Sequence, residues 1–290
     1  FKFKIAIDPK TGNLTYCYNI SNKPAVFAMD RANLTGEVTN LVAGIDGLLR
    51  TSAHCFDADG TLYVYDYDAR VSGSEKAIIY KIKDGVKTQL TEATTKFVQI
   101  SVTLASDGKD GLWVGQNRGA MDGYYQLVHV TAEGELDYIV NSSNTHGFTG
   151  GSSRGALAYD AERHILAQGR DGAVELFNVT YDVETGVPTL TKFATTPSVG
   201  YNIDGLAFDY AGDLYVVNSS NEKFQKFVVP TNNNTCTTPA PRAQVITKPS
   251  NPTLLDNTTV APQVQKIIRD GQVLIIRDGK TFNMMGQEVR

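Results

Sequence analysis

An aspartate returns along this chain at a nearly constant interval, and this repeat constrains the fold more than any other sequence feature. A small residue stands two places before each of these aspartates, and a turn then leads into an aliphatic residue. The repeat aspartates are 49, 50, 53 and 49 residues apart. A fixed period of this size is typical of a repeat architecture. The five sites are Ala6-Ile7-Asp8, Cys55-Phe56-Asp57, Ala105-Ser106-Asp107, Ala158-Tyr159-Asp160 and Ala207-Phe208-Asp209.

Each period contains four strand-like segments separated by turn residues. In the second period a first strand ends at Asp57, and apolar or mixed segments follow at 62–66, 77–82 and 88–91. Regular strands bounded by turns at this spacing predict an all-β fold, a five-bladed β-propeller of four-stranded blades. The fourth strand of the last blade is expected at 243–247. Because the chain starts within a strand-like segment, further blades are expected to fit upstream.

The repeat aspartates are predicted to be structural. Innermost strands converge on the propeller axis, where only small side chains such as alanine or cysteine fit. The aspartate that follows can accept hydrogen bonds from backbone N–H groups of the next turn. We therefore predict five turn-bracing carboxylates and no catalytic ring. The glycine of these turns is replaced in the fourth copy by Arg163-His164.

Composition excludes several classes of partner. With 27 basic and 31 acidic residues, the net charge of −4 gives no reason to expect nucleic acid as a partner. No apolar run reaches the ~18 residues that would span a membrane. Cys17, Cys55 and Cys236 show neither metal-ligand spacing nor a disulfide framework. Cys17 and Cys55 are predicted to be small apolar core residues, the alternative being a bridge between neighbouring repeats.

The blade sequences carry a family resemblance. The segments DADGTLYV at 57–64 and DYAGDLYV at 209–216 resemble blades of NHL-type and gluconolactonase-type propellers. The resemblance covers roughly residues 1–248 and implies the propeller fold.

One segment suggests an enzyme within that resemblance. Asp204, in Asn202-Ile-Asp-Gly205, is similar to the aspartate that binds the axial metal in gluconolactonase-like propellers. This implies a metal-dependent lactonase-like hydrolase that holds a divalent ion such as calcium at Asp204. That family also uses a glutamate of the first blade, which 1–8 lacks, and an asparagine where Ser153-Arg154-Gly155-Ala156 stands here.

The C-terminal region differs in composition from the repeats. We divide the chain into a propeller at 1–248, a linker rich in Pro, Asn and Thr at 249–263, and a tail at 264–290. The segment IIRDG occurs at 267–271 and again at 275–279, which predicts a small β-meander over 266–290 with Asp-Gly turns. The tail resembles part of the type IX secretion sorting segments of Bacteroidales proteins. This implies that residues 264–290 engage outer-membrane export machinery, and the alternative is a structural hairpin.

The remaining candidates point to ligand binding. His146 lies in the Gly/Ser-rich loop 144–153, and loops on a rigid scaffold often carry function. His129 alternates with apolar residues and is expected to be solvent-facing or half-buried. No nucleophile elbow, P-loop or His-Glu-x-x-His motif is present. The ligand-binding candidates are His146, Arg154, Asn117 and Asn218.

The sequence therefore favours a secreted or cell-surface propeller that binds a glycan or protein ligand, without a cofactor and without catalysis. Two alternatives stay open. One is the metal-dependent hydrolase centred on Asp204. The other is a structural subunit of a surface assembly that docks by strand addition.

Overall fold

The structure is a computed structural model. It describes residues 3–18, 24–33, 36–68, 76–97, 102–117, 124–141, 143–146, 148, 152–219 and 222–230, together with 265–269, 272–277 and 280–283. Two compact units are present, Phe1–Arg242 and Ala243–Arg290.

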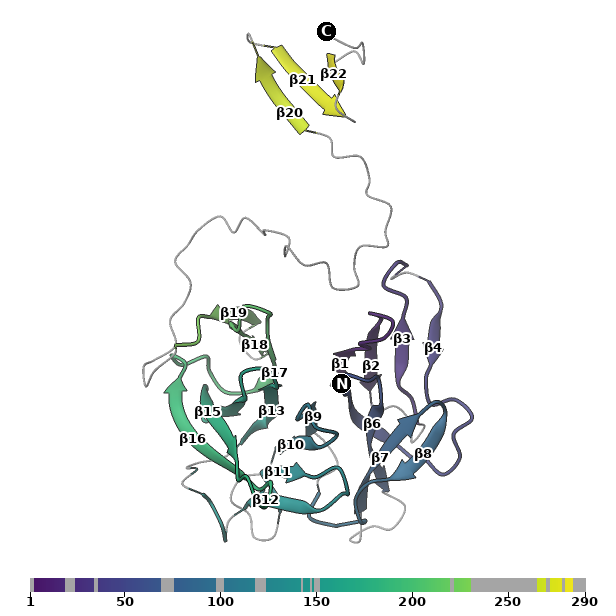
Figure 1. Cartoon of the computed structure of the whole chain (residues 1–290), viewed down its shortest axis with the longest axis vertical. Coiled ribbons are helices and arrows are strands. Elements are labelled where there is room, and N and C mark those ends of the chain that lie inside the picture. The colour runs from purple at the N-terminus through teal and green to yellow at the C-terminus, as the bar shows by residue number, and fades with distance from the viewer. Residues whose placement is uncertain are drawn as a thin grey trace. The chain divides into compact units, whose positions relative to one another are not determined.

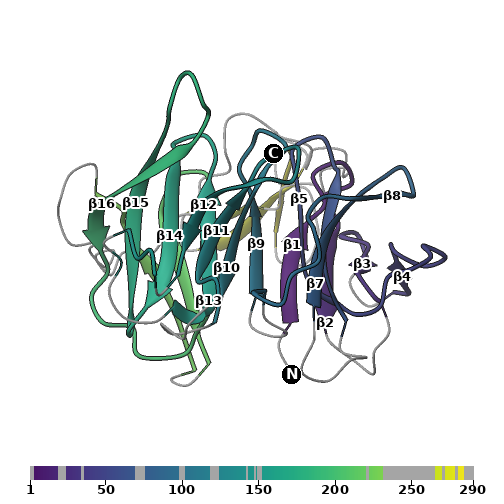
Figure 2. The same ribbon diagram turned by 90° about the horizontal axis from the view of Figure 1, so that it is seen from below.

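The first unit is a β-propeller built of consecutive antiparallel sheets (Figures 1 and 2). Blade 1 comprises β1 (Phe3–Ile7), β2 (Leu14–Tyr18), β3 (Phe27–Met29) and β4 (Val38–Asn40). Blade 2 comprises β5 (Thr51–Phe56), β6 (Leu62–Asp68), β7 (Lys76–Lys83) and β8 (Val86–Gln89). Blade 3 comprises β9 (Val102–Ser106), β10 (Leu112–Gln116), β11 (Leu127–Val130) and β12 (Leu136–Val140).

The last two blades continue the series. Blade 4 comprises β13 (Ser152–Asp160), β14 (Ile165–Arg170), β15 (Ala173–Tyr181) and β16 (Pro188–Thr195). Blade 5 comprises β17 (Ile203–Phe208), β18 (Leu214–Asn218) and β19 (Lys223–Phe227). The fivefold all-β propeller is therefore confirmed. The fourth strand expected at 243–247 lies outside the described residues.

The innermost strand of each blade is the one that ends at the repeat aspartate. These strands pack in sequence, β1 on β5, β5 on β9, β9 on β13 and β13 on β17. The ammonium group of Lys4 in β1 donates to the hydroxyl of Thr103 in β9 at 2.8 Å, so strands two blades apart meet near the axis. This convergence explains why small residues precede the repeat aspartates.

Four apolar clusters fill the seams between neighbouring blades. Each blade exposes alternate side chains to the blade before it and to the blade after it, since successive residues of a strand point to opposite faces. One cluster joins Cys17 of blade 1 to Val64 of blade 2, and the next joins Tyr65 of blade 2 to Val114 of blade 3. The others join blade 3 to blade 4 and blade 4 to blade 5.

The prediction for Cys17 and Cys55 is confirmed, because both are free and buried in these seams. Burial raises the pKa of the Cys17 thiol to about 12, so this thiol is inert at neutral pH.

The second unit contains a three-stranded antiparallel meander, as predicted. Its strands are β20 (Gln265–Arg269), β21 (Gln272–Arg277) and β22 (Lys280–Asn283). Arg269 pairs with Gln272, and Arg277 pairs with Lys280, so each Asp-Gly pair lies between paired strand ends. Among the residues that the structure describes, no helix is long and apolar enough to cross a membrane.

Candidate functional site

The repeat aspartates brace their turns through one carboxylate oxygen. Oδ1 of Asp107 accepts from the backbone N–H groups of Lys109 at 2.6 Å and Gly111 at 2.9 Å. Oδ1 of Asp57 and of Asp209 accept in the same way from the residues two and four places later. The predicted structural role is confirmed. In the fourth turn His164 takes the left-handed conformation, with φ of 54°, where the first, second and fifth turns use glycine and the third uses Asp110, with φ of 67°.

The second carboxylate oxygen differs from blade to blade. It accepts from a hydroxyl, a guanidinium or an ammonium group, or contacts an imidazole nitrogen, depending on the blade. All five carboxylates thus brace their turns through one oxygen, and the other oxygen has a different partner in each blade. The partners are Thr11 for Asp8, Tyr63 for Asp57, His129 for Asp107, Arg163 for Asp160 and Lys226 for Asp209.

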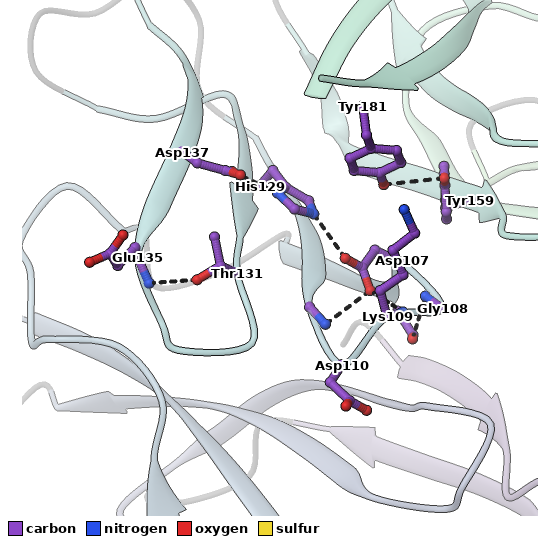
Figure 3. Close-up of polar contacts among 12 residues, drawn as sticks. Asp107, Gly108, Lys109, Asp110, His129, Thr131, Glu135, Asp137, Tyr159 and Tyr181 are labelled. Atoms are coloured by element: carbon purple, nitrogen blue, oxygen red, sulfur yellow. Dashed lines mark hydrogen bonds and ion pairs between the residues drawn. The ribbon is translucent and has the colours of Figure 1, made fainter. Parts of the chain in front are cut away.

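The third blade builds the most developed of these networks around His129 (Figure 3). Its Nε2 lies 3.0 Å from Oδ2 of Asp107, and its Nδ1 lies 2.6 Å from Oδ1 of Asp137. The β11–β12 register shifts between His129 and Val130, and Asp137 lies within that shift. The irregularity directs the Asp137 carboxylate toward the ring, which is a common effect of β-bulges.

The imidazole of His129 is enclosed by aromatic side chains from two blades. The Trp113 ring of its own blade is 4.7 Å away, and the Tyr181 ring of blade 4 is 6.0 Å away, between centroids. Only 3% of His129 is exposed. The expectation that His129 is solvent-facing or half-buried is therefore wrong, because blade 4 covers this face of blade 3.

Tyrosine hydroxyls extend the network toward the surface. The Tyr159 hydroxyl lies 3.3 Å from that of Tyr181 and 2.9 Å from Nδ1 of His164. The ammonium group of Lys109 is 4.0 Å from the centre of the Tyr181 ring. Burial raises the pKa of Tyr159 and of Tyr181, so both phenols stay protonated at neutral pH.

The electrostatics favour an ionised Asp107. Burial alone raises the pKa of its carboxyl, but hydrogen bonds from His129, Lys109 and Gly111 outweigh burial and leave the pKa below its usual value. Both nitrogens of His129 face carboxylate oxygens, so neither is free to take a proton from a bound molecule. His129 thus connects the two carboxylates, and we call Asp107, His129 and Asp137 the clasp.

A shallow groove of about 290 Å³ lies where the turns of blades 2 and 3 meet. The ammonium group of Lys83 pairs with Asp59, and that of Lys81 donates to the carbonyl oxygen of Ala132 at 2.6 Å. Hydrogen bonds from Asp57 and Lys83 lower the pKa of Asp59, whereas burial raises that of Asp57. Charges of both signs therefore line an open groove. The lining residues are Asp57, Asp59, Thr61, Tyr63, Lys81, Lys83, Val86, Thr88 and Asp110.

The predicted ligand-binding residues lie apart from this groove. Asn117 is exposed after β10, and Arg154 belongs to β13. His146 is exposed, with its ring stacked 4.3 Å from that of Tyr138. The amide of Asn218 is buried and donates to the carbonyl oxygens of three consecutive residues, 199–201, so it holds the loop before β17.

Asp204, the metal candidate, lies at a register shift in β17, and its Oδ2 accepts from the N–H of Ser219 at 2.9 Å. Within the described ranges, no three His, Cys, Asp or Glu side chains come together as a metal site. The calcium alternative stays a prediction.

Sequence reasoning missed the clasp and the groove. A usable signal existed: cross-strand register places His129 opposite Trp113, Lys81 opposite Tyr63 and Lys226 opposite Tyr215. In three blades a basic residue thus faces an aromatic one. The basic residue contacts the second oxygen of the repeat aspartate in blades 3 and 5, whereas in blade 2 the aromatic Tyr63 does so.

Comparisons with known proteins support the fold. No family model matches the chain, and no curated protein sequence matches it. A chain of a nidogen/laminin complex is 13% identical with a TM-score of 0.51, over 77% of this chain and 74% of that one. The soluble aldose sugar dehydrogenase of Escherichia coli is 12% identical with a TM-score of 0.50, over 95% of this chain and 92% of that one. At such low identity, these similarities identify a β-propeller scaffold.

Proposed function

We propose that the chain is a secreted or surface-displayed propeller that binds a glycan or protein ligand without transforming it. The observation that carries this proposal is the groove between the turns of blades 2 and 3. It is open, shallow and lined by carboxylate, ammonium and hydroxyl groups, which can exchange hydrogen bonds with a polar ligand.

The contacts of the buried His129 support binding over catalysis. A general base must reach its substrate with a free acceptor atom. His129 instead contacts a carboxylate oxygen at each ring nitrogen and is almost fully buried. The imidazole and carboxylate groups that could act in a reaction instead contact one another and hold strands together.

A binding experiment tests the groove. The protein is screened on a glycan array and, in parallel, against surface proteins by pull-down, and the affinity for each hit is measured by calorimetry. Lys83→Ala and Thr88→Ala are expected to weaken binding about tenfold, because each removes a donor from the groove. Unchanged affinity in both variants would place the ligand elsewhere.

Lys192→Ala is the matched control. Lys192 pairs with Glu175 on blade 4, and its side chain is about as exposed as that of Lys83. Loss of an exposed pair has little effect on folding, so this variant should bind like the unmodified protein.

The proposed location of the protein at the cell surface is tested by deleting the tail, residues 264–290. A variant lacking 264–290 is followed in the native host by surface labelling. We expect it to remain inside the cell, and unchanged export would contradict the sorting role.

A further inference from the structure

Every blade presents two faces, and the repeat makes equivalent positions on them comparable. The residue three places before the repeat aspartate points back toward the preceding blade. The residue two places before it points forward, toward the next blade. We call these the backward face and the forward face.

At the position three before the aspartate, the side chain is buried in blades 2, 3 and 4, half-buried in blade 5 and exposed in blade 1. Leu104 of blade 3 and Leu157 of blade 4 are 5% and 2% exposed at the position three before the aspartate. Ile5 holds the same position in blade 1 and is 65% exposed, and Ile7 is 56% exposed. An isoleucine at a position that is otherwise a seam residue thus faces outward.

Cross-strand register places seven apolar side chains and one polar side chain, that of Asn40, on the backward face of blade 1. By contrast, Thr15 and Cys17 on its forward face are fully buried against blade 2. Ile5, Ile7 and Val38 are the exposed apolar residues of the backward face, whereas Leu14, Tyr16, Phe27 and Met29 are half-buried. Exposed apolar residues that share one face of a sheet point to an interaction site. The apolar side chains that share the backward face are Ile5, Ile7, Leu14, Tyr16, Phe27, Met29 and Val38.

At the other end of the series, the forward face of blade 5 is also exposed. Phe224 is 68% exposed on this face, beside Tyr215, with their ring centroids 5.4 Å apart. Trp113 holds the position of Tyr215 in blade 3 and is completely buried. The backward face of blade 5 packs normally on blade 4 through Leu214 and Val216.

Within the described part of the first unit, four seams join five blades, and no comparable packing joins β17 to β1. A closed propeller buries both faces of every blade. Here one backward and one forward face lack the cover that equivalent faces have elsewhere.

We propose that these two faces receive one further blade, carried by polypeptide outside residues 1–290. The occupant is a β-sheet with apolar side chains on both faces, because it continues the series of blade-to-blade interfaces at both ends. It should also offer a backbone carbonyl near Lys226, since the equivalent Lys81 donates to Ala132 of the next blade. The meander of the second unit does not fit this description, because it has three short strands and lacks the aspartate turn of the repeat.

The experiment adds a blade and measures the accessibility of both faces. A copy of residues 51–101, which contains β5 to β8 and the following connection, is placed directly ahead of Phe1. Ile7→Cys and Phe224→Cys are each made in a Cys236→Ser background, and thiol labelling is followed by mass spectrometry. Val183→Cys is the matched control, because Val183 is fully exposed in the turn between β15 and β16.

In the 290-residue protein, all three introduced thiols are expected to label at similar high rates. With the added blade, labelling at positions 7 and 224 should slow by about tenfold or more, while position 183 is unchanged. The copy of Cys55 reports whether the added blade has folded, because the thiol of Cys55 is buried in the original. If that copy labels freely, the same test is made with residues 102–151 as the added blade.

Three results would overturn the proposal. Fast labelling at positions 7 and 224 despite a folded added blade would mean that the faces do not accept one. Slow labelling in the 290-residue protein that becomes fast when 264–290 is deleted would make the chain its own occupant. Slow labelling that depends on protein concentration, with dimers seen by light scattering, would make the occupant a second copy.

Discussion

The third and fifth blades carry the same network at equivalent positions and differ in what covers it. In blade 3 Asp107 faces His129, and both side chains are 4% exposed beneath blade 4. In blade 5 Asp209 faces Lys226, and these side chains are 20% and 21% exposed. The repeat therefore sets the network, and the next blade decides whether its charges are buried.

The largest effect is expected from His129→Ala. It leaves the carboxylates of Asp107 and Asp137 without their shared partner, and leaving a buried carboxylate uncompensated costs about 4 kcal/mol. Urea unfolding at pH 7 measures the loss. Lys226→Ala, the equivalent change in blade 5, should cost clearly less because its carboxylates reach water, and equal losses would refute the role of burial.

The seam positions extend the comparison to apolar residues. Leu104→Ala should lower the free energy of unfolding by about 3 kcal/mol, since it opens a cavity between blades 2 and 3. Ile5→Ala, at the same repeat position, should change it by no more than about 0.5 kcal/mol. A large loss at Ile5 in the 290-residue protein would mean that its face is already covered.

The pH dependence of stability tests a second difference, between the two buried histidines His54 and His129. His54 contacts the hydroxyl of Thr15 and lacks the carboxylates that flank His129, and burial lowers its pKa from 6.5 to about 4. A depressed histidine pKa means that the unfolded chain binds more protons between those values. Stability is therefore full above pH 6.5 and falls as the pH drops toward 4.

Between pH 7.5 and pH 4.5 this effect should remove about 2.5 kcal/mol of unfolding free energy. Chemical unfolding across this range measures it, and His54→Gln should flatten the profile. A His54→Gln profile as steep as that of the unmodified protein would assign the pH dependence to other groups.

The smallest effect on the free energy of unfolding is expected at Tyr181, whose ring lies over His129. Tyr181→Phe keeps the ring over His129 and removes one hydroxyl contact with Tyr159, which should cost about 1 kcal/mol. Tyr201→Phe, at an exposed position, should leave the unfolding midpoint unchanged. Equal shifts in the two variants would show that the Tyr159–Tyr181 contact contributes nothing.

Local interactions explain what could be predicted from the sequence. The turn at Asp107 closes within four residues, and Arg269 pairs with Gln272 three places later in the chain, so both follow from short-range patterns. The four strands of each repeat follow from alternation and turn residues. The clasp was missed because Asp107 follows β9, whereas His129 and Asp137 lie in β11 and β12, and the register shift at Asp137 has no clear sequence signal.

The sequence by itself determined the repeat, the strand order and the turn-bracing aspartates, because these depend on contacts between residues near one another in the chain. Only the tertiary structure decided that His129 is buried and Ile5 is exposed. Burial depends on the neighbouring blade. The local sequence pattern of a strand is the same whether or not another blade covers that strand. For the same reason, the two uncovered faces can be recognised only in the tertiary structure, which shows which blades pack on one another.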